Sequence, residues 1–173
     1  ICLGKNSGGS FTTTNSNIAI GIDAASTSNS TTNSVVIGTS AGRGPGASNV
    51  VIGHEAKYQE DNFSRCVVLG YQAGFEVDGD DNVLIGYRAG YQLEDSSNNT
   101  FIGSGAADAI TTGYSNVAIG ADALTTSTTG TFNCAVGTEA FSLLTTNSQN
   151  AAFGVYAGRR ATGGSNTFIG YSA

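Results

Sequence analysis

The sequence has little of what most soluble domains use to build a core or a catalytic site. It contains no Met or Trp, one Pro and one His, and only 12% of its 173 residues are charged. Scarce charge and Pro argue against disorder, which usually brings both. A net charge of −6 without a basic face excludes nucleic acid as an expected partner. No apolar run approaches the ~20 residues that cross a bilayer, so we expect no membrane insertion by this segment.

What the sequence has is a short phrase that recurs along its whole length: two apolar residues, a large aliphatic or aromatic residue, Gly, two variable residues and Ala. Successive repeat glycines are 15 to 17 residues apart. So short a period leaves no room for a helical hairpin, but it suits one turn of a β-solenoid. We therefore predict an all-β fold, a β-solenoid of about eleven coils of 15–17 residues, as one repeat domain over residues 1–173 of a longer fibrous protein. The repeat glycines are Gly4, Gly21, Gly38, Gly53, Gly70, Gly86, Gly103, Gly120, Gly137, Gly154 and Gly170.

The residues before each repeat glycine have the alternation of a strand. The positions one and three before it are apolar in nearly every coil, and they share a face because strand side chains alternate. We expect these two columns to line the interior. The column between them is also apolar, and on this reading it points outward and needs a cover, which a second copy of the chain would supply. The sequence thus predicts a homotrimer around a shared axis, with this interface: Val36, Val51, Val68, Leu84, Phe101 and Phe168.

The other columns are typical of turns. Asn stands four before the glycine in most coils and is expected either in a turn or in an amide ladder between coils. The glycine allows a corner with positive φ, and Ala three after it, as at Ala73, Ala89 and Ala123, indicates close packing. We interpret the polar second half of each coil as a short second strand and an exposed turn. An apolar residue recurs there seven after the glycine, as Phe11, Val77, Leu93, Ile110 and Leu144.

The titratable residues predict no catalytic set. The single histidine, His54, follows a repeat glycine at a variable and exposed position. Eight after the glycine, three consecutive coils carry Asp61, Asp78 and Glu94, which stacking would bring about 5 Å apart. A Ca²⁺ ion bound by these oxygens would relieve the repulsion, whereas the alternative is a solvated acidic stripe. We expect no other cofactor.

The three cysteines, Cys2, Cys66 and Cys134, lie four coils apart from one another. Four coils at ~4.8 Å each separate neighbours by about 19 Å, and a disulfide needs Cα atoms within about 7 Å. We therefore expect no disulfide within the chain, and interpret all three as small buried apolar residues.

Six phrases carry a resemblance to known repeats: NIAIGIDAA, NVVIGHEA, NVLIGYRAG, NTFIGSGAA, NVAIGADAL and NTFIGYSA. They resemble the head repeat of YadA-type trimeric autotransporter adhesins and the collar and shaft repeat of bacteriophage tail fibres. The resemblance implies a trimeric left-handed β-roll or triple β-helix that forms a stiff rod with a binding tip. The Tyr-containing corners at Gly70-Tyr71, Gly86-Tyr87 and Gly170-Tyr171 are closer to the fibre repeats.

These observations favour a non-enzymatic shaft and receptor-binding segment of a trimeric phage tail fibre. Located in the virion, it would attach to a glycan or protein receptor on the host cell surface. One alternative is the head of a trimeric bacterial adhesin on the outer cell surface. A second alternative is a monomeric ice- or glycan-binding solenoid. Thr pairs such as Thr128-Thr129 would form its ice-binding surface. An enzyme is the weakest class, because glycan cleavage needs paired carboxylates in a groove, and only the acidic residues could supply them.

Overall fold

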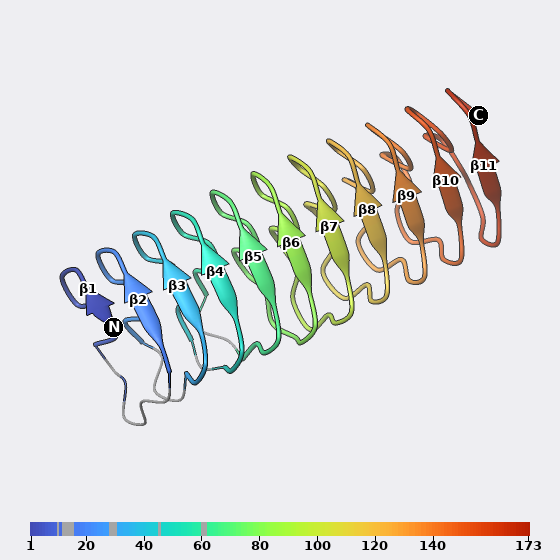
Figure 1. The fold of residues 1–173 in the computed structure, drawn as a ribbon. Coiled ribbons are helices and arrows are strands. Elements are labelled where there is room, and N and C mark those ends of the chain that lie inside the picture. The colour runs from blue at the N-terminus through green and yellow to red at the C-terminus, as the bar shows by residue number, and fades with distance from the viewer. Residues whose placement is uncertain (10, 12–15, 28–30, 45, 60–61) are drawn as a thin grey trace.

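The fold is a β-solenoid without helices in the described part of the chain. The computed structural model describes residues 1–9, 11, 16–27, 31–44, 46–59 and 62–173. Eleven short strands follow one another in sequence order in a single parallel sheet, which forms one side of a rod with the termini at opposite ends (Figure 1). The strands are β1 (Cys2–Leu3), β2 (Ile18–Ile20), β3 (Val35–Ile37), β4 (Val50–Ile52), β5 (Val67–Leu69), β6 (Val83–Ile85), β7 (Thr100–Ile102), β8 (Val117–Ile119), β9 (Cys134–Val136), β10 (Ala151–Phe153) and β11 (Thr167–Ile169).

Each strand ends directly before the repeat glycine, where the sequence predicts a corner. Gly86 has φ +137°, a conformation that an L side chain rarely adopts. A Cβ at this position would also collide with the carbonyl oxygen of Gly103 in the next coil. The glycine therefore both turns the chain and lets successive coils approach at the strand spacing. Ala89, three residues after Gly86, is fully buried at the corner, which confirms the close packing expected there.

The asparagine column forms an internal amide ladder, one of the two arrangements expected. The backbone N–H of Asn116 donates to Oδ1 of Asn99 (2.9 Å), and the N–H of Asn133 donates to Oδ1 of Asn116 (2.9 Å). The side-chain Nδ2 of Asn116 donates across the coil to the carbonyl of Gly130 (2.8 Å). Asn99, Asn116 and Asn133 are buried, so these bonds satisfy backbone groups that water does not reach.

The predicted assignment of the two strand faces is wrong. The central residue of each strand from β2 to β10 is buried, and the residues that flank it are half-buried or exposed. The cause is the asparagine ladder. The asparagine side chains, four positions before the glycine, point inward. Because strand side chains alternate, the residues two positions before the glycine point inward as well. The residues expected at a trimer interface therefore belong to the interior: Val36, Val51, Val68, Leu84 and Phe101 are at most 3% exposed, and half-buried Phe168 packs on the same core.

The opposite wall of each coil contributes the rest of the core. Val77, Leu93, Ile110 and Leu144 are fully buried, so the apolar position seven after the glycine faces inward at these coils. The second strand predicted for this wall is absent among the described residues, where the only pairing outside the sheet is an isolated bridge between Thr32 and Ala47. The return segment is held instead by backbone hydrogen bonds between coils, such as Asp78 N–H to the carbonyl of Leu93 (3.0 Å).

Interior volumes compensate one another across the coil. Leu84 fills the space over Gly90, where an added Cβ would lie 2.9 Å from Leu84 Cδ2. Two coils later the strand contributes only Ala118, and the position equivalent to Gly90 is Leu124, which is fully buried. The core therefore keeps its density although no single column has a constant size.

No helix in the part of the chain that the structure describes is long and apolar enough to cross a membrane.

Candidate functional site

The outward side of the sheet is an apolar face, and no described residue of this chain covers it. We define the outer face as the residues one and three before each repeat glycine. Neither column contains a charged residue, and most positions hold Ile, Val or Leu. Leu3, Ile52, Ile119, Phe153 and Ile169 are between 37% and 74% exposed. The unpartnered apolar surface that the sequence predicts thus exists, but it lies on the face opposite to the one expected.

Stacked aromatic rings run along the corner that follows the strands. His54 stacks on Tyr71 with ring centroids 5.4 Å apart, and Tyr71 stacks on Tyr87 at 5.7 Å. All three side chains follow a repeat glycine directly, so the common offset in consecutive coils was a signal that sequence reasoning could have used. His54 is exposed, as predicted, and its Nδ1 lies 3.8 Å from Oε2 of Glu55. The ladder reinforces the stacking of coils, because each ring covers the face of the next.

A second ladder lies on the return segment, five residues after the glycine. Tyr58 stacks on Phe75 at 4.9 Å, and Phe75 stacks on Tyr91 at 5.0 Å. The guanidinium of Arg43 lies 4.7 Å from the ring centre of Tyr58, and that of Arg88 lies 4.2 Å from Tyr91. These cation–π contacts cover the two ends of the ladder.

The acidic residues line a shallow hollow beside this second ladder. Asp78 and Glu94, two of the three predicted calcium ligands, line it with Gln59, Glu76 and Asp95 around about 420 Å³. The third, Asp61, lies outside the described residues. Burial and the neighbouring Glu94 raise the pKa of Glu76. Among the residues that the structure describes, no group of three or more His, Cys, Asp or Glu side chains could hold a metal ion.

Ion pairs connect adjacent coils near this region. Arg65 Nε lies 2.7 Å from Asp81 Oδ1, and Arg65 Nη2 lies 2.8 Å from Asp80 Oδ2. Hydrogen bonding to Arg65 lowers the pKa of Asp81. Arg88 Nη2 contacts Asp108 Oδ1 at 3.2 Å, yet burial still raises the pKa of Asp108. Both arginines therefore pair with carboxylates of the next coil, which lie outside the column of Asp78 and Glu94.

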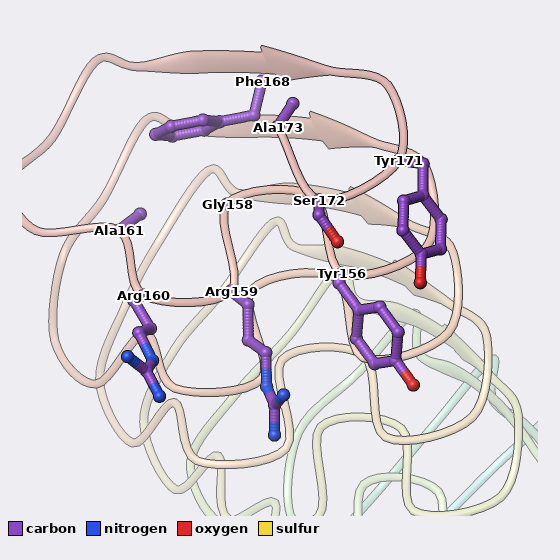
Figure 2. A pocket seen from close by; sticks show the side chains of 9 residues that line it. All are labelled: Tyr156, Gly158, Arg159, Arg160, Ala161, Phe168, Tyr171, Ser172 and Ala173. Atoms are coloured by element: carbon purple, nitrogen blue, oxygen red, sulfur yellow. The ribbon is translucent and has the colours of Figure 1, made fainter.

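A larger hollow, about 570 Å³, lies over the last coil. Figure 2 shows Phe168 and Ala161 on its apolar side, with Arg159, Arg160 and Tyr156 around it. Phe168 occupies the same strand position as Leu84 and Phe101, which are fully buried between coils. The hollow is therefore part of the surface on which coils pack.

The three cysteines are free, but only one matches the expected burial. Cys66 is buried in the asparagine column, where its Sγ accepts the N–H of Asn82 (3.4 Å), and burial raises the pKa of its thiol to about 11. Cys134 is half-buried on the outer face, and Cys2 is exposed in β1. The prediction of three buried cysteines is therefore wrong for Cys2 and Cys134.

Comparison of the chain with protein-family models, with curated proteins and with solved structures finds no match.

Proposed function

We propose that this chain is a shaft segment of a homotrimeric phage tail fibre that attaches the virion to a glycan or protein receptor on the host cell surface. The observation that carries the proposal is the uninterrupted parallel sheet of eleven strands, in which each coil pairs with the next in the same register. At about 4.8 Å per strand the sheet extends roughly 48 Å along the rod, and its length can grow by adding coils.

The composition supports a mechanical role. The repeat uses its side chains on coil-to-coil contacts: the asparagine ladder, the aromatic ladders and the ion pairs all join neighbouring coils. Because many of these contacts must break before the coils separate, the rod should unfold slowly. Such resistance suits a stiff rod that connects a receptor to the particle.

Labelling of intact particles tests the proposal. An antibody raised against residues 1–173 should mark virion tail fibres in electron micrographs, and light scattering of the purified segment should give the mass of three chains. Labelling of a bacterial cell surface in place of virions would overturn the fibre assignment in favour of an adhesin head. A monomer that adsorbs to ice or to glycans would overturn both.

Glycan cleavage is tested on the same preparation. Incubation with host surface polysaccharide should release no new reducing ends. Turnover that disappears in Asp78→Asn would place an active site in the acidic hollow and overturn the non-enzymatic assignment.

A further inference from the structure

We propose that the outer face is the surface through which copies of this chain pack, with their rods parallel and their coils at the same level. The inference rests on the proposed homotrimeric rod and names the face that joins its subunits. It replaces the interior column that the sequence analysis assigned to this role.

The first argument is the character of the outer face. The face runs from β1 to β11, is apolar at every position except Thr100 and Thr167, and contains no charged side chain. Ile119 and Phe153 are 37% and 46% exposed although their chemistry favours burial. A continuous apolar strip on a soluble protein marks an interaction surface.

The second argument is area. The strip is about 48 Å long and one three-residue strand, about 10 Å, wide, which gives roughly 500 Å². With the corner columns on either side, the flat side reaches roughly 900 Å². In a trimer this area is shared between two neighbours, and each chain would bury about as much as the roughly 800 Å² that one partner contributes to a stable protein interface. A second copy is a sufficient occupant because its strip has the same length, the same strand spacing and the same lack of charge.

The third argument is charge at the two edges of the face, which selects the parallel orientation. The column two after the glycine is acidic at Asp23, Glu55, Asp122 and Glu139, with Arg88 as its one cation. Antiparallel rods packed face to face would oppose this acidic edge to itself. Parallel rods oppose it to the column five before the glycine, which carries Arg65 and Asp81 and is otherwise uncharged. Like charges across an interface are destabilising, so the parallel arrangement is favoured.

A matched pair of substitutions tests the face. Ile119→Asp places a carboxylate on the outer face at a residue that is 37% exposed, and Leu143→Asp places one on the return segment at a residue that is 47% exposed. Ile119→Asp should raise the concentration at which the oligomer is half dissociated at least about tenfold, whereas Leu143→Asp should leave it unchanged. Circular dichroism of both variants establishes that the monomer remains folded.

The outcomes separate this inference from the proposed function. Wild-type protein that stays monomeric at high concentration would refute the homotrimeric rod itself. A wild-type trimer that a folded Ile119→Asp variant leaves intact would refute only the assignment of the face.

A native cysteine tests the orientation without a change to the face. In a Cys2→Ser variant, Cys134 on the outer face is the accessible thiol, because Cys66 is buried. In a parallel, level assembly the Cys134 residues of different copies lie at the same height, and a bismaleimide of about 15 Å span should join them with high yield. Antiparallel rods with aligned ends would set them six strands, about 29 Å, apart along the axis. An oligomer without cross-linked chains would overturn the parallel orientation.

Discussion

The substitution Asn116→Ala removes one rung of the asparagine ladder and should destabilise the protein strongly. Oδ1 of Asn116 accepts the backbone N–H of Asn133 at 2.9 Å, and its Nδ2 donates to the carbonyl of Gly130 at 2.8 Å. Asn116 is 0% exposed, so the alanine variant leaves two backbone groups without a partner in a region that water does not reach. At about 1–3 kcal/mol for each orphaned group, we expect a loss of about 2–6 kcal/mol in the free energy of unfolding.

Urea titration at one fixed protein concentration, followed by circular dichroism, measures this loss. Asn116→Ser is the informative companion, because Ser34 already occupies the same column: its Oγ accepts the N–H of Asn49 (3.1 Å) and donates to the carbonyl of Thr32 (3.0 Å). The serine variant should therefore lose about half as much as the alanine variant. Gln92→Ala, on an exposed side chain, should change stability by less than about 0.5 kcal/mol. A loss below about 1 kcal/mol for Asn116→Ala would refute the ladder as a source of stability.

Three further substitutions test the interior and the acidic hollow by the same titration. Gly86→Ala should lower the free energy of unfolding by more than about 2 kcal/mol, because φ at this position is +137° and the new Cβ would collide with Gly103. A variant as stable as the wild type would mean that the corner relaxes freely. Ser127→Ala should stabilise the fold by about 1 kcal/mol, since the buried Ser127 Oγ has no hydrogen-bond partner, and a destabilised variant would point to a bond that the structure lacks. For Glu76 the folded pKa is raised, so its contribution to stability is complete below the unfolded pKa of about 4.3 and is lost as the pH rises through the folded value. Glu76→Gln should therefore remove part of the fall in stability above that pH, and identical pH profiles for the two proteins would contradict the assigned burial.

The repeat made the architecture predictable from the sequence. A glycine every 15 to 17 residues fixes where each strand ends, and its positive φ follows from the missing side chain. The asparagine ladder and the buried apolar column seven after the glycine were equally accessible, because each recurs at a constant offset. The acidic hollow was found only in part: Asp78 and Glu94 share a column, but Glu76 and Gln59 approach them from a different one. That neighbourhood depends on the path of the return segment, which has no regular strand pattern to indicate it.

The two faces of the strand could not be told apart by polarity, since both are apolar, yet two other signals in the sequence distinguish them. The column one before the glycine is large in every coil, whereas the column two before it varies from Ala118 to Phe101. An interior must keep a constant total volume, so an inward column can vary only if another column compensates, as Leu124 does for Ala118. The second signal is parity. An asparagine whose amide stacks between coils points inward, and alternation then carries the residue two positions later inward as well. Volume compensation and the asparagine ladder together assign the variable column to the core. They leave the uniformly large column outside, on the face through which we propose that copies of the rod pack.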